Sequence, residues 1–177
     1  MSGGMVLVDV SGKASSVLST KGDLATFSTL RVRKGIGTNS QLLFADSADA
    51  TGNVWSDNTT SFVIACSDET SDLETGDNKA QIRLPFQFEL TDITANVNIA
   101  PVGSAISIQV QEDGSDILST PITIDVTDTT SESAATQPVI SDSTLASNSI
   151  ISIDLDIIGS STAGTGLKIN LIGYRVV

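Results

Sequence analysis

The carboxylates are the residues of this 177-residue chain best suited to chemistry. Asp154 and Asp156 lie two positions apart in a segment that alternates apolar and polar residues. They therefore share one face of a predicted strand, roughly 7 Å apart at the backbone. Two carboxyl groups can flank a sugar in a glycosidase. The apolar neighbours should face the core, so we expect both aspartates to face water and Lys168 to pair with Asp154 across strands.

A second acidic group occupies a ten-residue stretch, residues 68–77. Its members are Asp68, Glu69, Asp72, Glu74 and Asp77. Acidic loops can supply the six to eight oxygens that calcium takes, but the EF-hand spacing is absent. We expect a solvated acidic loop and no cofactor, although the sequence leaves a calcium ion open.

The sequence argues against nucleophilic catalysis and against nucleotide binding. Cys66 is the single cysteine and follows an apolar run, and the chain has no histidine to activate it. Residues 159–166 have the glycine spacing of a phosphate loop, but Thr165 stands where the lysine should be. We therefore expect no enzymatic activity and no catalytic, cofactor-binding or metal-binding residues.

The charge balance excludes several partners. Twenty-one acids against nine bases give a net charge of −12, which argues against nucleic acid and against an anionic membrane surface. We find neither a run of 18 apolar residues nor a secretion-signal pattern, so we expect no membrane insertion. Arg31, Arg33 and Lys34 form the one basic cluster, which is either a polar strand face or a docking patch for an acidic neighbour such as another copy of the chain.

The elements that must position these residues are predicted to be strands. Serine, threonine, aspartate, isoleucine and valine dominate, a composition typical of β-structure. Period-two alternation marks 62–66, 80–90 (interrupted by Pro85), 93–99, 106–111, 122–126, 151–157 and 167–171, with a tight Asp113–Gly114 hairpin after 112. With about eight strands, residues 61–177 read as an antiparallel β-sandwich domain of jelly-roll-like type in an all-β chain.

Residues 1–60 have too little apolar sequence to fold alone. We predict an extended N-terminal docking and oligomerisation segment that is covered by the sandwich or by other copies of the chain. The residues predicted to carry assembly or docking are Val6, Val8, Leu24, Phe27, Leu30, Arg31, Arg33, Lys34 and Trp55.

Two groups of motifs resemble tailed-bacteriophage virion proteins. Residues 19–24 read STKGDL, 32–43 read VRKGIGTNSQLL, 45–47 read ADS and 51–55 read TGNVW, which is similar to a segment of phage fibre and appendage proteins. Residues 67–70 (SDET), 82–86 (IRLPF), 100–104 (APVGS), 117–120 (ILST), 156–159 (DIIG) and 166–168 (GLK) resemble a β-sandwich module of phage structural proteins. Together the motifs cover 19–173.

The resemblance implies a non-enzymatic virion protein that is made in the host cytoplasm and placed on the particle surface. Because the chain is short, we expect a capsid decoration (cement) or head-fibre protein, with the major capsid protein or other virion proteins as partners. The resemblance to fibre proteins implies a homotrimer. The alternative is a tail-fibre or tail-tip receptor-binding protein, whose loops at 112–116, 127–137 and 159–166 would contact a host surface glycan or receptor.

Overall fold

The computed structural model describes residues 24–27, 31–38 and 41–176, and every regular element in these ranges is a β-strand. Val6, Val8 and Leu30, which were predicted to carry assembly or docking, lie outside these residues. The chain divides into two compact units, with the boundary between Asp57 and Asn58. The described residues offer no helical segment with the length and hydropathy that a bilayer crossing requires.

In its described residues, the N-terminal unit contains two small antiparallel pairs. Strand β1 (Leu24–Phe27) pairs with β2 (Arg31–Lys34), and β3 (Gln41–Ala45) pairs with β4 (Asn53–Asp57). Isolated two-stranded hairpins are marginally stable in water because each has one ladder of hydrogen bonds and little apolar surface to bury.

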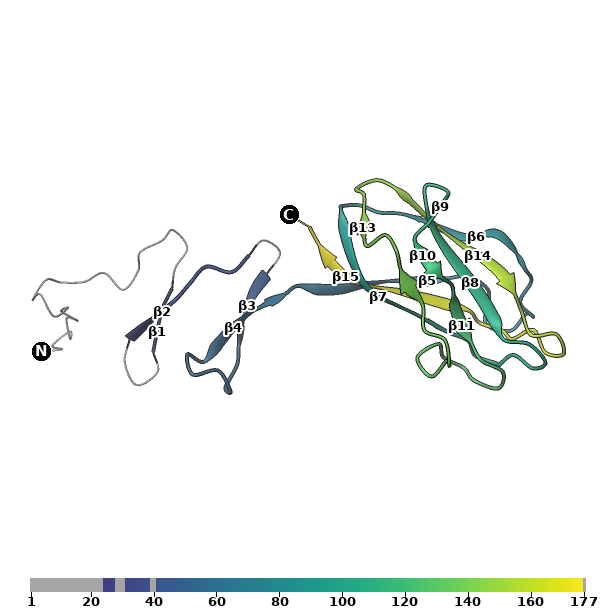
Figure 1. Cartoon of the computed structure of the whole chain (residues 1–177), viewed down its shortest axis with the longest axis horizontal. Helices are drawn as coiled ribbons and strands as arrows, with labels where there is room; N and C mark the ends of the chain where they lie inside the picture. The colour runs from purple at the N-terminus through teal and green to yellow at the C-terminus, as the bar shows by residue number, and fades with distance from the viewer. Residues whose placement is uncertain (1–23, 28–30, 39–40, 177) are drawn as a thin grey trace, which may run out of the picture. The chain divides into compact units, whose positions relative to one another are not determined.

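The C-terminal unit carries the remaining strands, all in antiparallel pairs (Figure 1). They are β5 (Thr59–Ala65), β6 (Gly76–Arg83), β7 (Phe88–Asn96), β8 (Ile106–Glu112), β9 (Ser115–Asp116), β10 (Leu118–Thr120), β11 (Ile122–Ile124), β12 (Val139–Ile140), β13 (Thr144–Leu145), β14 (Ile150–Ile157) and β15 (Lys168–Arg175). One sheet has the order β13-β7-β15-β5, and the other has β11-β8-β14-β6 with β9 also on β8. Strands β10 and β12 form a separate pair.

The pairing of these strands is nested. The first strand of the unit, β5, pairs with the last, β15, and the second, β6, pairs with β14. Further inward along the chain, β7 pairs with β13, and β8 pairs with β11. Successive strands β5, β6, β7 and β8 alternate between the two sheets. The first half of the unit therefore pairs strand by strand with the second half, in reverse order along the chain.

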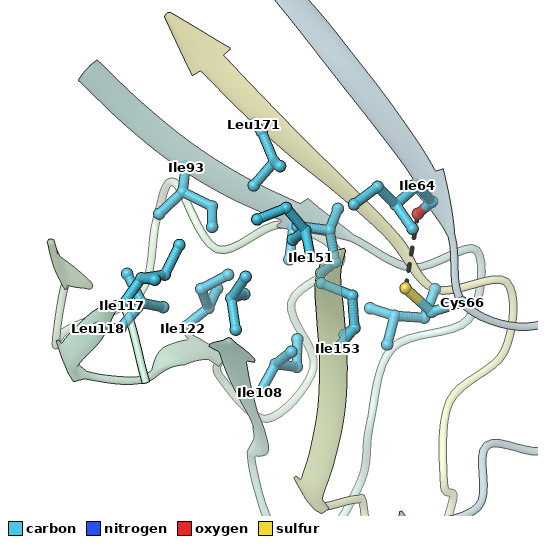
Figure 2. Packing of buried hydrophobic residues seen from close by; sticks show 14 of the residues in the cluster. Ile64, Cys66, Ile93, Ile108, Ile117, Leu118, Ile122, Ile151, Ile153 and Leu171 are labelled. Atoms are coloured by element: carbon cyan, nitrogen blue, oxygen red, sulfur yellow. Dashed lines mark hydrogen bonds between the residues drawn. The ribbon is translucent and has the colours of Figure 1, made fainter. Parts of the chain in front are cut away.

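Both sheets contribute to one apolar core. Ile64, Ile93 and Leu171 from the first sheet and Ile108 and Ile153 from the second are at most 3% exposed and belong to a single cluster (Figure 2). Burying each such side chain stabilises the fold by about 1.5–3 kcal/mol. Every fully buried residue of this cluster lies between positions 64 and 171, so the C-terminal unit has a complete core of its own.

Two predicted strand boundaries are wrong. Residues 80–90 were expected to form one interrupted strand and 93–99 another, but β6 ends at Arg83 and β7 runs from Phe88 to Asn96 in the other sheet. The chain crosses between sheets around Pro85, which cannot donate to a ladder. The switch of apolar parity after Leu90 is a β-bulge at Thr91.

Gly173 makes this bulge possible. It lies opposite the bulged segment, and a Cβ at this position would come within 1.9 Å of the carbonyl oxygen of Glu89. The predicted tight turn at Asp113–Gly114 is confirmed, because both residues have positive φ (47° and 83°) and Glu112 pairs with Ser115.

Candidate functional site

The β3–β4 hairpin exposes a row of apolar side chains. Three successive residues, Leu42, Leu43 and Phe44, are 47%, 38% and 46% exposed. Side chains alternate along a strand, so Leu42 and Phe44 point to one face and Leu43 to the other. The register places Phe44 opposite Val54 on the first face, and we call Leu42, Phe44 and Val54 the open face of the hairpin.

The opposite face is partly covered by the segment that precedes β3. Trp55 lies opposite Leu43, and its indole Nε1–H donates to the carbonyl oxygen of Gly35 at 2.7 Å. Gly37 lies so close to the indole ring that a Cβ there would be 2.7 Å from it. The covered face explains why a glycine stands at position 37, and it leaves Leu42 and Phe44 on the side that this segment does not cover.

The loop that closes the hairpin is held by its own polar groups. The amide of Gly52 donates to the carbonyl of Asp49 at 2.9 Å, and Asp49 Oδ1 accepts the amide of Thr51 at 2.7 Å. Lys34 Nζ lies 3.5 Å from Asp49 Oδ2. Hydrogen bonds from Thr51, and then the Lys34 charge, hold the pKa of Asp49 below its ordinary value. The hairpin thus presents its open face from an ordered turn.

The structure places some of the predicted docking residues near this hairpin. Lys34 binds Asp49 within the unit, and Trp55 is half-buried beneath Gly35. Leu24 is 39% exposed and lies opposite Lys34 in the β1–β2 pair. Phe27, Arg31 and Arg33 lie in the same strand pair, with Phe27 opposite Arg31 and Arg33 opposite Ala25.

The open face of the hairpin was not predicted from the sequence. Leu42, Phe44 and Val54 were not among the predicted docking residues. The signal was present, because three consecutive apolar residues in a strand of a two-stranded hairpin must expose at least one face.

The prediction that both strand aspartates face water is wrong for Asp154. Only 7% of Asp154 is exposed, whereas Asp156 is exposed. Strand β14 is central, with β6 and β8 on its two sides, so side chains of neighbouring strands, such as Gln109 opposite Asp154, flank the carboxylate. The ladder between β14 and β6 shifts register here, and Asp154 Oδ1 accepts the amide of Asn78, a residue with φ 54°, at 2.7 Å. The Asp154 carboxylate therefore replaces a backbone acceptor where the β14–β6 ladder is interrupted.

Partial burial and neighbouring negative charges perturb the carboxyl group of Asp156. Partial desolvation, and after it the charges of Asp154 and two further aspartates, raise the pKa of Asp156. The expected ion pair between Lys168 and Asp154 is also wrong, since these residues lie in different sheets. Lys168 Nζ instead lies 2.8 Å from Glu69 Oε1, and this contact together with the Asn98 amide lowers the pKa of Glu69.

Residues 68–75 of the acidic stretch form the predicted loop, but Asp77 lies in β6. The first carboxylate of this loop accepts hydrogen bonds from the loop's own backbone. Asp68 Oδ1 accepts the amides of Thr70 (2.8 Å) and Ser71 (2.6 Å), and these bonds lower the pKa of Asp68 to about 2. Among the described residues, no group of three or more histidine, cysteine or acidic side chains could hold a metal ion. The loop borders a hollow of about 270 Å³ that also contacts Cys66, Leu73 and Lys79.

Cys66 lies in the core at the end of β5. Its Sγ is 3.5 Å from the carbonyl oxygen of Ile64 (Figure 2), and desolvation raises its pKa to about 12. At neutral pH the side chain is therefore a protonated thiol, which is a poor nucleophile.

Comparison with known proteins gives no further assignment, because no family model, no curated protein and no solved structure matches the chain.

Proposed function

We propose that the chain is a non-enzymatic structural protein of a tailed-bacteriophage virion, a capsid decoration (cement) or head-fibre protein that assembles as a homotrimer on the particle surface. The observation that carries this proposal is the open face of the β3–β4 hairpin, where Leu42 and Phe44 are nearly half exposed on an otherwise ordered element. The proposal has three supports: the fold, the exposed hairpin and the sequence resemblance.

The fold that we assign to the C-terminal unit is a jelly-roll sandwich. When the short strands β9, β10 and β12 are set aside, eight strands remain, four in each sheet. They pair first with last, second with seventh, third with sixth and fourth with fifth, which is the order expected of that fold. Jelly rolls occur in viral capsid proteins, lectins and cupins, so the fold is compatible with a virion role and does not by itself specify it.

The N-terminal unit supplies the argument for assembly. A two-stranded hairpin is marginal in water, and one with a row of exposed apolar side chains is less favourable still. Covering Leu42 and Phe44 would contribute roughly 1 kcal/mol for each half-buried side chain. Copies of the same segment around a symmetry axis would cover the open face, and we propose three copies on the basis of the resemblance to fibre proteins.

Chemical features of the C-terminal unit favour a passive role. The thiol of Cys66 is protonated and buried, and Asp154 is engaged by a backbone amide. The acidic surface is suited to keeping a particle-bound protein soluble and to approaching a basic partner surface.

The location is tested by labelling virions with an antibody against the C-terminal unit, followed by electron microscopy. Label distributed over the head supports the proposal. Label confined to the tail tip would assign the chain to the alternative, a receptor-binding tail-fibre or tail-tip protein. Absence of the chain from purified virions would refute both.

Assembly is tested by the double substitution Leu42→Ser/Phe44→Ser, with Ile99→Ser as the matched control. Ile99 is 52% exposed in the C-terminal unit, so the control removes an equally accessible apolar side chain from a different surface. A three-fold fall in mass for the hairpin variant alone, measured by sedimentation, supports assembly through the open face. Equal masses for the wild type and both variants would refute it.

A further inference from the structure

Strand β5 forms the outer edge of the sheet β13-β7-β15-β5. Just after this strand, the Cys66 amide donates to the carbonyl of Leu167 at 2.8 Å. Hydrogen-bonded positions alternate in an antiparallel pair, so Phe62 and Ile64 also turn their backbone groups toward β15. The intervening residues turn their backbone N–H and C=O groups outward: Thr59, Ser61, Val63 and Ala65. Within the described ranges, β5 pairs with β15 alone, and no further backbone hydrogen bond engages these outward groups.

The strand is also well exposed. Five of its seven residues are exposed, and Val63 has an exposed fraction of 63%. Its sequence, TTSFVIA, contains no charge, no proline and no glycine, and its register with β15 has no bulge. Long, flat, uncharged edges of this kind are ready templates for another strand.

The other edges of the two sheets carry protection that β5 lacks. Strand β6 contains Lys79 and Arg83, and the ladder it shares with β14 has a register shift. Strand β11 has three residues directly after Pro121, and β13 has two residues. Charges, bulges, proline and short length are the usual means of blocking edge-to-edge pairing. Among these edges, β5 is therefore the one best suited to pair with another strand.

We propose that β5 is an interface for strand addition and that its occupant is β5 of a second copy of this chain, in antiparallel orientation. One register engages all four outward residues, with Thr59 opposite Ala65 and Ser61 opposite Val63 of the second copy. Each mutual pair forms two backbone hydrogen bonds, so the contact has about eight. The two sheets become one continuous sheet across a two-fold axis.

Self-complementarity favours a second copy in this orientation. A two-fold axis requires a strand that tolerates its own sequence, and β5 brings no like charges together. Asp57 precedes the strand, and antiparallel pairing places the two copies of Asp57 at opposite ends of the interface, whereas parallel pairing would place them side by side. The exposed Val63 side chains of the two copies become diagonal neighbours on the outer face of the joined sheet.

This proposal does not depend on a virion role or on the open face of the β3–β4 hairpin. Pairing through β5 doubles whatever assembly the N-terminal unit forms. A loss of β5 pairing halves the mass, whereas a loss of the hairpin contact divides it by three, so failures of the two proposals are distinguishable.

The test uses the full chain with Val63→Lys and Val63→Pro, and with Val139→Lys as the control. Lysine protects an edge, and proline is tolerated where the N–H faces away from the ladder. Val139 is 51% exposed on β12, away from β5, so Val139→Lys introduces the same charge elsewhere. Circular dichroism spectra establish that each variant is folded. Sedimentation at several protein concentrations should show a two-fold lower mass for either Val63 variant and the wild-type mass for the control.

Amide hydrogen exchange gives an independent readout. The Ser61 and Val63 amides should exchange slowly in the concentrated wild-type protein and quickly after dilution. Pairing should strengthen when salt rises from about 0.05 to about 0.5 M, because both copies carry a net negative charge that salt screens. Unchanged mass in a folded Val63→Lys variant would overturn the proposal. Slow exchange that is independent of concentration would assign the edge to another part of the same chain and would also overturn it.

Discussion

Replacing Asp154 by alanine removes the acceptor that closes the ladder gap between β14 and β6. The lost bond is the 2.7 Å hydrogen bond from the Asn78 amide to the carboxylate of Asp154, a residue that is only 7% exposed. A hydrogen bond to a charged group contributes roughly 1.5–3 kcal/mol. Relief of the repulsion between Asp154 and Asp156 returns up to about 1 kcal/mol, because Asp156 is exposed and screened.

The expected net loss in the free energy of unfolding for Asp154→Ala is therefore about 0.5–3 kcal/mol. For a protein of this size, the melting temperature should fall by roughly 1–12 °C. The matched variant Asp154→Asn retains a carbonyl oxygen and removes the charge, so it should lose less than about 1 kcal/mol.

The assay is thermal and urea unfolding followed by far-ultraviolet circular dichroism. Fluorescence of the single tryptophan is unsuitable, because Trp55 lies in the N-terminal unit. Wild-type stability for Asp154→Ala would refute the role assigned to this carboxylate. Equal destabilisation by alanine and asparagine would show that the charge, and not the acceptor geometry, is what the fold requires.

Three further predictions concern single side chains. Asp156→Asn should raise the free energy of unfolding at pH 7 by up to about 1 kcal/mol, because the folded state destabilises the ionised form of Asp156 and raises its pKa. The gain should vanish below pH 3.8, where the carboxyl group is protonated in both the folded and the unfolded states, and unfolding measured at several pH values checks this. Gly173→Ala should cost about 1–3 kcal/mol, measured by urea unfolding, because its Cβ meets the Glu89 carbonyl. Asp68→Ala should destabilise the protein at pH 7, because the folded state stabilises the ionised form of Asp68 and lowers its pKa to about 2. The difference in free energy of unfolding between variant and wild type should disappear as the pH falls from 3.8 through about 2, which urea unfolding across that range checks.

The strand content was predictable because alternation is a local property. The Asp113–Gly114 turn is an example, since both residues tolerate the positive φ that the structure shows. The break near Pro85 and the continuity through Thr91 were not predictable in the same way. Alternation reports parity but cannot distinguish a strand end from a bulge, and the close approach at Gly173 that permits the bulge is a tertiary feature.

The exposure of Asp154 and the partner of Lys168 depend on which strand is central and which sheet each strand joins. No local pattern encodes that β14 lies between β6 and β8, or that β15 belongs to the other sheet. The open face of the hairpin was within reach of the sequence, because Leu42 and Phe44 share parity beside a turn. The edge position of β5 could not be predicted from the sequence, because it depends on which strands pair with β5 and no local pattern records this.

The mass of the full chain in solution, compared with that of Leu42→Ser/Phe44→Ser, tests most directly whether other copies shelter the N-terminal hairpin. The account predicts a wild-type mass of three chains or a multiple of three, and a three-fold smaller mass for the double variant while its C-terminal unit stays folded. A wild-type protein that sediments as a single chain at the highest concentration attainable would contradict it.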